Sequence, residues 1–399
     1  MKIVFITSTC SQKKYTELFY ARKEKIIDPA QKFFDQIIRG VANSEHEVIS
    51  IGALPVSAST IKKKLFRKEI EEVGKVKYIY PGFVNGKILR FITVFFSVLI
   101  EAAKINAQET VFICDPLYTH VSLPARTIAK IKGIKTIAMV TDIPSFATSM
   151  KYSKHKTVKE RLQSVYEYFS ELDIKKYDGY INLSVYMNEL INPKNKPSIT
   201  IEGSIDEETV NSGNKKEIES PDIVLYAGGV FEQYGVKTLV NAFSEIEDCN
   251  AELHIYGSGS YVHELERVCK KHYNIKYCGC VLNSDLLNIE KKALLLVNPR
   301  PTREVFTKYS FPSKTLEYMM SGTPLLSTRL LGIPKDYYEF VYWIDDESKE
   351  GIKNILKSIL KKSKEELYLF GNQAKEFAVI NKSNIVQGRR IVEFLMRFV

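Results

Sequence analysis

The sequence predicts an α/β protein made of two doubly wound domains, each with a mostly parallel sheet. Strand-like and helix-like runs alternate along almost the whole chain, which is typical of parallel strands joined by helical crossovers. At 399 residues, the chain is also longer than one hydrophobic core usually supports. A stretch rich in Pro, Lys and Asn at residues 191–206 separates two such alternations and is suited to a linker.

The first half, residues 1–200, begins with a predicted strand. MKIVFITSTC is a short alternating apolar run and lacks the longer apolar stretch and the cleavage site of a signal peptide. Further strand-like runs follow, with helix-like segments between them. The predicted strands of this half cover residues 3–7, 46–53, 110–115, 135–142 and 179–184.

The second half, residues 201–375, repeats the pattern. Its predicted helices include GVKTLVNAFSEI and YVHELERVCKKH. The last segment, residues 376–399, ends in SNIVQGRRIVEFLMRFV, whose apolar residues recur at helical spacing and predict a C-terminal helix. The predicted strands of the second half cover residues 222–228, 252–257, 275–279, 294–299, 323–328 and 342–345.

The net charge of +10 is concentrated in the first half. Residues 1–200 hold 31 Lys and Arg against 19 Asp and Glu, a net charge of +12, whereas the rest holds 26 against 28, a net charge of −2. A basic half suits nucleic acid, an anionic membrane surface or phosphorylated substrates as partners. Lysines on solvated helices are the simpler alternative.

Residues 60–105 carry the strongest membrane signal. TIKKKLFRKEI sets basic residues around two apolar side chains, and ten uncharged, mostly apolar residues separate Arg90 from Glu101. Spanning a bilayer takes about 20 apolar residues, so the second segment predicts a buried or interfacial helix. The two segments together predict peripheral contact with an anionic membrane, against the alternative of a solvated charged loop.

Cysteine usage indicates a reduced, intracellular protein. The six cysteines are scattered, with no CxxC pair and no nearby His or Asp at metal-ligand spacing, so no structural zinc site is expected. They are Cys10, Cys114, Cys249, Cys269, Cys278 and Cys280.

The main candidate site follows the fourth strand of the second half, because doubly wound sheets bind ligands at the carboxyl ends of their strands. A helix is predicted to start near Ser313, where Pro312 suits a first-turn position and backbone N–H groups can hold a phosphate. Glu317, one turn further on, can accept two hydrogen bonds from a ribose diol, although the helix dipole also favours a glutamate there. The basic residues of this segment are Arg300, Arg303, Lys308 and Lys314.

Glycine turns at other strand ends add to this site. Gly228 and Gly229 end the strand 222–228, a helix starts after Gly235, and Gly257 lies in YGSGS after the next strand. The first segment has neither the GxGxxG nor the Walker pattern, but the three glycine turns together predict a crevice lined with backbone amides. In the first half, Asp115, His120 and Asp142 follow strands. Each alone is compatible with a structural role, while the two carboxylates at adjacent strand ends favour contact with a substrate hydroxyl.

Residues 222–330 resemble the donor-binding domain of retaining glycosyltransferases of the GT-B fold, the glycosyltransferase family 4 group. The motifs that carry the resemblance are LYAGGVFEQYGVKTLVNAF, ELHIYGSGS and NPRPTREVFTKYSFPSKTLEYMMSGTPLLST, in the order and spacing of the family. The resemblance implies two Rossmann-like domains with a cleft between them, the first for the acceptor and the second for a nucleotide-sugar donor. It also implies that the C-terminal helix packs back on the first domain.

The family's motif implies roles for particular residues. Glu317 stands at the position of the glutamate that holds the ribose, and Tyr309 where the family usually has a carboxylate that contacts the transferred sugar. Thr141 stands where a histidine is usual, which leaves Asp142 as the polar group of that segment. In the loop after the first strand of the domain, Gly229 and Tyr234 replace the usual diphosphate-binding arginine and lysine. The diphosphate charge is therefore expected to be met by Lys308, Arg303 or Arg300, with Ser313 and Lys314 at the helix start.

The resemblance implies transfer of a sugar, with retention of configuration, from a nucleoside-diphosphate sugar to an acceptor hydroxyl. A UDP-sugar is the favoured donor, and a saccharide or lipid-diphosphate-linked saccharide of bacterial capsule or exopolysaccharide assembly is the expected acceptor. Asp142 and Lys308 are the expected catalytic residues, and Asp115 and His120 are assigned to the acceptor side. No obligatory metal and no other cofactor are expected. The expected location is cytoplasmic, peripheral on the inner face of the cell membrane.

Two other functions remain open on the sequence alone. A nucleotide-sugar epimerase on the same fold would need acid and base groups converging on the sugar, and few are present beyond Asp115, His120 and Asp142. A non-catalytic protein that binds membranes or nucleic acid would use the basic first half. The aromatic and basic pattern of single-strand binders is not evident, and nucleic acid is not expected as a partner.

Overall fold

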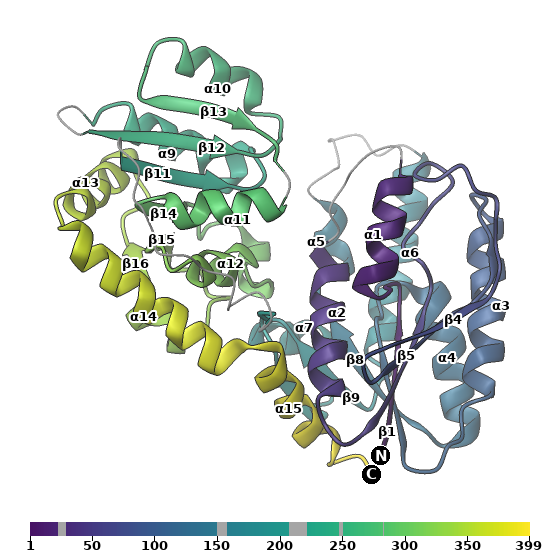
Figure 1. Ribbon diagram of the computed structural model, residues 1–399. Coiled ribbons are helices and arrows are strands. Elements are labelled where there is room, and N and C mark those ends of the chain that lie inside the picture. Colours follow the sequence, from purple (N-terminus) through teal and green to yellow (C-terminus); the bar gives the residue numbers. More distant parts are fainter. Residues whose placement is uncertain (23–28, 150–157, 207–221, 247–249, 282) are drawn as a thin grey trace. The chain divides into compact units, whose positions relative to one another are not determined.

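The chain forms two compact units, and each is a sheet flanked by helices (Figure 1). The first unit comprises residues 1–204 and 383–399, and the second comprises residues 205–382. The computed structural model describes residues 1–22, 29–149, 158–206, 222–246, 250–281 and 283–399. The predicted α/β class with parallel, doubly wound sheets is confirmed in both units.

The sheet of the first unit has eight strands in the order β10-β9-β8-β7-β1-β2-β5-β4. All neighbours are parallel except β4 and β5, which form an antiparallel hairpin at one edge. The sequence prediction missed β4, β5 and β10. The strands are β1 (Lys2–Thr7), β2 (Glu47–Gly52), β4 (Glu69–Val73), β5 (Val76–Tyr80), β7 (Thr110–Cys114), β8 (Lys135–Val140), β9 (Gly179–Asn182) and β10 (Ser198–Thr200).

Helices cover both faces of this sheet, because β2 and β7 lie on opposite sides of β1 and right-handed crossovers then fall on opposite faces. One layer holds α1 (Gln12–Ala21), α2 (Pro29–Ala42) and α15 (Asn384–Leu395), and the other holds α3 (Leu89–Ala103), α4 (Thr119–Lys132) and α6 (Val158–Ile174). Two short helices, α5 (Pro144–Ser149) and α7 (Asn188–Ile191), follow strands β8 and β9. A separate two-stranded ribbon pairs β3 (Leu65–Phe66) with β6 (Phe83–Val84).

The sheet of the second unit has six parallel strands in the order β13-β12-β11-β14-β15-β16. They are β11 (Asp222–Ala227), β12 (Ala251–Tyr256), β13 (Ile275–Gly279), β14 (Leu295–Asn298), β15 (Leu325–Thr328) and β16 (Tyr342–Ile344). The strand order reverses between β11 and β14, which is the switch point where such sheets bind ligands. The helices are α9 (Val236–Phe243), α10 (Val262–Cys269), α11 (Asn283–Lys292), α12 (Lys314–Ser321), α13 (Lys349–Leu360) and α14 (Lys364–Lys382).

The predicted C-terminal helix over residues 376–399 is divided between two helices. Its first residues belong to the end of α14, and the last helix, α15, begins only at Asn384. The chain continues in α14 to Lys382, and the Ser383 hydroxyl then accepts the N–H of Val386 and caps α15. Within the first unit, α15 crosses α2 at glycines: a Cβ at Gly40 would lie 1.9 Å from the carbonyl oxygen of Asn384.

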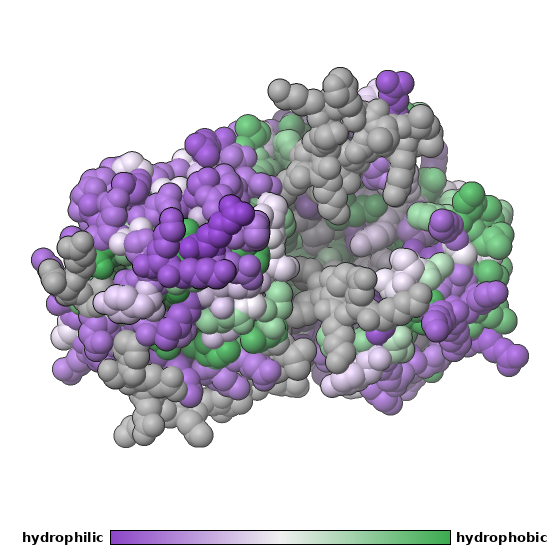
Figure 2. All heavy atoms as spheres, turned by 90° about the horizontal axis from the view of Figure 1, so that it is seen from above, coloured by the Kyte–Doolittle hydropathy of each residue, from purple (hydrophilic) through white to green (hydrophobic). Residues whose placement is uncertain are grey.

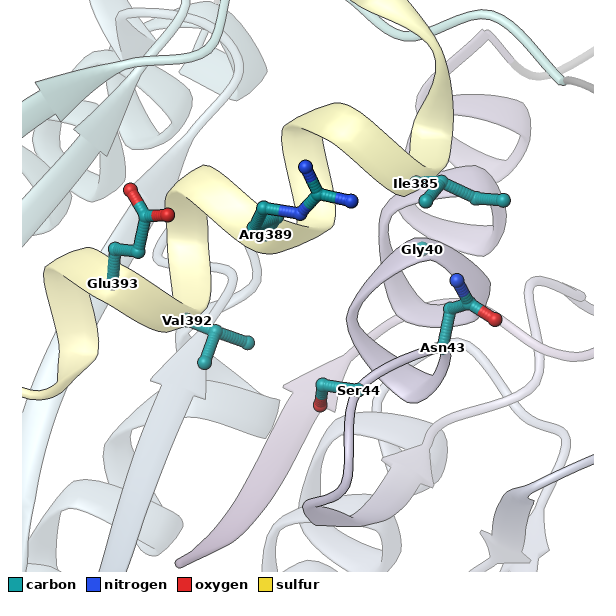
Figure 3. A pocket seen from close by; sticks show the side chains of 7 residues that line it. All are labelled: Gly40, Asn43, Ser44, Ile385, Arg389, Val392 and Glu393. Atoms are coloured by element: carbon teal, nitrogen blue, oxygen red, sulfur yellow. The ribbon is translucent and has the colours of Figure 1, made fainter.

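A pocket of about 140 Å³ lies beside this crossing. Figure 3 shows its lining side chains coming from α15 and from the end of α2. Asn43 and Ser44 lie shortly before the start of β2, so the pocket lies at the amino ends of the strands, opposite the edge where ligands are expected.

The cysteines in the described residues are free thiols. Cys10 and Cys114 are buried, and burial raises the pKa of both thiols well above the usual value. The sixth cysteine, Cys249, lies outside the described residues.

Candidate active site

Two glycine turns of the second unit are joined backbone to backbone at the carboxyl ends of β11 and β12. A Cβ at Gly257 would lie 1.8 Å from the carbonyl oxygen of Gly228, and one at Gly259 would lie 2.0 Å from that of Val230. The N–H of Val230 donates to the carbonyl of Ser258 at 2.9 Å. Side chains are therefore excluded, and the turns present main-chain groups, as a site for close ligand approach requires.

The loop after β14 packs against the same region. Gly235 has a φ of +79°, and a Cβ there would lie 1.9 Å from the carbonyl oxygen of Pro299. The next residue, Arg300, places its guanidinium carbon 4.6 Å from the ring centroid of Tyr234 and 5.6 Å from that of Phe306. The two rings hold the Arg300 guanidinium at the loop after β11. In the family that the sequence resembles, this loop carries the basic residues that bind the diphosphate.

The other two basic candidates of this loop lie differently. Arg303 is 79% exposed and forms a long ion pair, 3.7 Å, with Glu304. Lys308 is partly buried, with its ammonium nitrogen 5.3 Å from the ring centroid of Tyr309. Arg300 is therefore the most firmly held of the three basic residues.

Helix α12 begins at Lys314, with Ser313 as its N-cap residue and no side-chain cap hydrogen bond. Pro312 lies just outside the helix rather than in its first turn, and its carbonyl accepts the N–H of Thr315 at 2.8 Å. The first turn of α12 therefore keeps backbone donors and the positive end of the helix dipole at this edge of the sheet.

Lys314 is held by carboxylates instead of pointing freely toward a ligand. Its ammonium nitrogen lies 2.6 Å from Glu317 and 3.7 Å from Glu290 of α11, whose side chain is fully buried. Burial alone would lower the pKa of Lys314, but the two carboxylates outweigh it and raise the pKa. The ammonium is thus charged, and it balances the buried Glu290 while orienting Glu317.

Tyr318 and Glu290 are the site residues that the sequence prediction missed. The Tyr318 hydroxyl accepts the N–H of Ala227 at 2.9 Å and donates to the carbonyl of the same residue at 3.0 Å. This fully buried contact holds α12, at the residue after its first turn, beside the end of β11. The apolar spacing of KTLEYMMS marks Tyr318 as a core residue but gives no sign of its hydrogen bonds.

In the first unit, Asp115 and Asp142 lie at one sheet edge, because they follow the paired parallel strands β7 and β8. The Asp115 carboxylate accepts the N–H of Leu117 at 3.1 Å, and Asp142 accepts the N–H of Ile143 at 2.8 Å. Burial raises the pKa of Asp142 to about 6, although the Ile143 N–H lowers it. Asp142 can therefore titrate near neutral pH, as a group in contact with substrate often does.

His120 lies inside the first turn of α4 rather than in a loop. It is 7% exposed, and its ring packs 4.6 Å from Phe91 and 6.1 Å from Tyr118, centroid to centroid. Burial, and then the nearby Arg90, lower the pKa of His120 to about 4, so the imidazole is neutral at physiological pH. Both ring nitrogens are buried without a hydrogen-bond partner among the described residues.

Replacing Asp142 by asparagine is expected to stabilise the protein above pH 6. A carboxyl whose pKa is raised from about 4 to about 6 binds more protons folded than unfolded in that window, so native stability falls as the pH rises through it. Asparagine keeps the oxygen that accepts the Ile143 N–H and removes the cost of burying an ionised carboxylate. The free energy of unfolding is therefore expected to rise by about 2 kcal/mol at pH 7.5 and to be unchanged near pH 4. Urea denaturation at several pH values measures this difference.

Asp346 provides the control for that measurement. The Ser348 N–H lowers the pKa of Asp346, so Asp346→Asn is expected to give no gain at neutral pH. Equal pH profiles for Asp142→Asn and the wild type would contradict the assigned burial penalty.

Within the described ranges, no three His, Cys, Asp or Glu side chains lie close enough to hold a metal ion. The donor-side arrangement instead combines backbone donors, a fixed arginine and a carboxylate, which is a chemistry suited to a phosphate next to a diol.

Two parallel Rossmann-like sheets, with the last helix returning to the first unit, define the GT-B class, and solved structures agree. The chain matches a sucrose-phosphate synthase from Thermosynechococcus elongatus with a TM-score of 0.69 at 12% identity, covering 100% of this chain and 99% of that one. It matches the E. coli protein described as "Trehalose-6-phosphate … bound with UDP-2-fluoro glucose" with a TM-score of 0.67 at 8% identity, over 100% of both chains. Anabaena HepE in complex with UDP matches with a TM-score of 0.57 at 12% identity, again over 100% of both chains.

Residues 221–381 match the family described as Glycosyl transferases group 1. This range covers nearly all of the second unit, so the similarity to that family lies in the second unit. A comparison with curated protein sequences finds no match.

Proposed function

We propose that the protein is a retaining glycosyltransferase that moves a sugar from a UDP-sugar to a hydroxyl of a saccharide or lipid-linked saccharide in surface polysaccharide assembly. The observation that carries the proposal is the second unit's switch point, where the start of α12, the glycine turns and Arg300 converge. UDP is favoured because the E. coli and Anabaena proteins were solved with UDP-2-fluoro glucose and UDP.

Each donor-side residue then has a defined task. Backbone N–H groups at Ser313 and Lys314 hold a phosphate, and Arg300 neutralises the diphosphate from the side, with Lys308 and Arg303 as the less well placed cations. Glu317, oriented by Lys314, accepts the hydroxyls of the ribose. Tyr309 lies next to Lys308 on the segment assigned to the transferred sugar. Gly228, Gly229 and Gly257 allow the backbone to approach the nucleotide.

The reaction proceeds at the anomeric carbon of the donor. The acceptor hydroxyl attacks from the face that UDP leaves, the bond from the anomeric carbon to the β-phosphate oxygen breaks, and the hydroxyl proton passes to the departing phosphate. Negative charge develops on the diphosphate, and fixed donors and cations stabilise it more in the transition state than in the ground state. No metal is required in this proposal. Asp142 orients a sugar hydroxyl, and Asp115 and His120 belong to the acceptor side.

The acceptor assignment draws on the first unit. Its basic surface and the apolar helix α3 suit a sugar carried on a lipid diphosphate, and we place the protein in the cytoplasm, peripheral on the inner face of the membrane through residues 60–105. Within the described residues, no helix combines the length and apolar character needed to cross a bilayer.

Thermal denaturation with a panel of UDP-, GDP- and dTDP-sugars tests the donor assignment. UDP at about 100 times its dissociation constant stabilises a binding protein by about 2.7 kcal/mol, which corresponds to roughly 5–10 °C for a unit of this size. UDP and UDP-sugars are expected to raise the melting temperature and the GDP and dTDP compounds to have less effect. No shift with any nucleotide would contradict the proposed function.

Incubation with UDP-sugars separates the proposal from the alternatives. With an acceptor saccharide, NMR is expected to show a new glycoside with the anomeric configuration of the donor, together with free UDP. An isomerised nucleotide sugar without free UDP would indicate an epimerase instead. Salt-sensitive binding to anionic surfaces with no nucleotide binding would indicate a non-catalytic protein.

A further inference from the structure

Helix α3 exposes a stripe of large apolar side chains along its whole length. Ile88, the N-cap residue of α3, is followed at intervals of four residues by Ile92, Phe96 and Ile100, so the four share one side of the helix. Their exposed fractions are 74%, 48%, 58% and 52%. We call these four residues the α3 stripe. Apolar surface of this extent in a row is unusual for a side that faces water, and it marks an interaction site.

Neighbouring side chains widen the stripe. Leu89 and Phe91 of α3 are about half exposed, and α4, which packs beside α3, also carries an exposed apolar side chain, Ile131 at 75% exposure. In Figure 2, green apolar spheres gather along the right-hand rim of the first unit, the side on which Figure 1 draws α3.

A basic segment is fixed beside the stripe. The β3–β6 ribbon is tied to α3 because the N–H of Val84 donates to the Thr93 hydroxyl at 3.1 Å and the Ser97 hydroxyl donates to the carbonyl of Gly82 at 2.6 Å. Residues 60–68, which include β3, contain five basic and no acidic side chains, and all five are exposed. They are Lys62, Lys63, Lys64, Arg67 and Lys68.

The acidic residue of α3 offsets only part of this charge. Glu101 is bound by Lys68 at 2.7 Å and by Lys104 at 2.8 Å. Burial raises the pKa of Glu101, but the hydrogen bonds from the two lysines outweigh it and the pKa is lowered, so the carboxylate is ionised and shared by two cations. The border of the stripe is therefore positively charged.

We propose that the α3 stripe and the basic segment 60–68 form one docking face for an anionic lipid bilayer, with α3 lying flat in the interface. The 15 residues of α3 span about 22 Å, shorter than a bilayer's hydrocarbon core, and suit a helix parallel to the surface. Exposed cations next to an apolar stripe match anionic headgroups above acyl chains. Because the Phe91 ring contacts His120 at the start of α4, docking brings the edge that carries Asp115 and His120 to the lipid surface. The inference rests on the proposed function only for the identity of the acceptor.

Vesicle flotation tests the docking face. The full-length protein is expected to float with phosphatidylcholine–phosphatidylglycerol vesicles and not with pure phosphatidylcholine, and to lose binding at high salt because screening shortens the reach of the charges. A variant with Ile92→Ser, Phe96→Ser and Ile100→Ser is expected to lower the partition coefficient at least about tenfold. A variant with Lys62→Gln, Lys63→Gln and Lys64→Gln is also expected to lower it at least about tenfold.

The matched control replaces equally exposed apolar residues of the second unit. Leu369→Ser and Ile380→Ser on α14, where the side chains are 56% and 60% exposed, are expected to leave flotation unchanged. All variants replace exposed residues outside the donor site, so their thermal shift with UDP is expected to match the wild type and to show that they fold.

Several results would overturn the docking face: wild-type protein that does not float, equal flotation on neutral vesicles, or a serine variant that floats like the wild type. A wild-type dimer that the serine variant converts to a monomer would show instead that the stripe joins two copies of this chain. Flotation without UDP binding would contradict the proposed function but support the docking face. UDP binding without flotation would contradict the docking face but support UDP as the donor nucleotide.

Discussion

Replacing Gly257 by alanine is expected to lower the free energy of unfolding by at least about 3 kcal/mol and to abolish UDP binding. Its φ of +129° is a conformation that residues with a side chain rarely adopt, and the added Cβ would lie 1.8 Å from the carbonyl oxygen of Gly228. The obstructing atom belongs to the backbone and cannot rotate away. Relief requires the turns after β11 and β12 to separate, which dismantles the crevice.

Gly279 gives a matched control, because its φ is +70° and a Cβ there meets no atom within 4 Å. Gly279→Ala is expected to cost only the left-handed backbone penalty, about 1 kcal/mol, and to preserve UDP affinity. Urea denaturation and calorimetric titration with UDP measure both variants. If the two alanines had equal effects on stability and affinity, the contact between the two turns would not matter.

The inner strands of the second unit could be predicted closely because they are mostly buried on both faces and appear as continuous apolar runs. The predicted strand 222–228 exceeds β11 by one residue, and the predicted strand 294–299 exceeds β14 by one residue at each end. The missed strands have another character. In β4, EIEEV, most side chains are exposed at the sheet edge, so no apolar pattern marks it, and its pairing with β5 depends on the turn at Gly74.

The candidate site could be predicted as a set of residue types at strand ends, but not as a set of contacts. Lys314 appeared as a phosphate ligand, and the structure shows it between Glu317 and Glu290, a residue 24 positions earlier on another helix. The stacking of Arg300 on Tyr234 joins residues 66 positions apart. Such pairs follow from helix packing and loop geometry, which a single sequence does not record.

Replacing Glu317 by alanine is expected to weaken UDP binding by about 10- to 100-fold, because a charged acceptor contributes about 1.5–3 kcal/mol to its hydrogen bonds. The carboxylate is 20% exposed, lies in the first turn of α12 and is oriented by Lys314 at 2.6 Å. Glu317→Gln keeps the shape and removes the charge, so its affinity is expected to fall between those of the wild type and the alanine variant. Calorimetric titration with UDP measures all three.

The ligand itself can show whether Glu317 holds the ribose. Wild-type protein is expected to bind 2′-deoxy-UDP about tenfold more weakly than UDP, whereas Glu317→Ala has no carboxylate to distinguish them and is expected to bind both equally. Glu350 is the matched control, since it also lies in the first turn of a helix, α13, and forms an ion pair with a lysine three residues away, Lys353 at 2.6 Å. Glu350→Ala is expected to bind and discriminate like the wild type. A Glu317→Ala protein that still preferred UDP tenfold would place the ribose contact on another residue and leave Glu317 as the partner that keeps Lys314 and Glu290 in position.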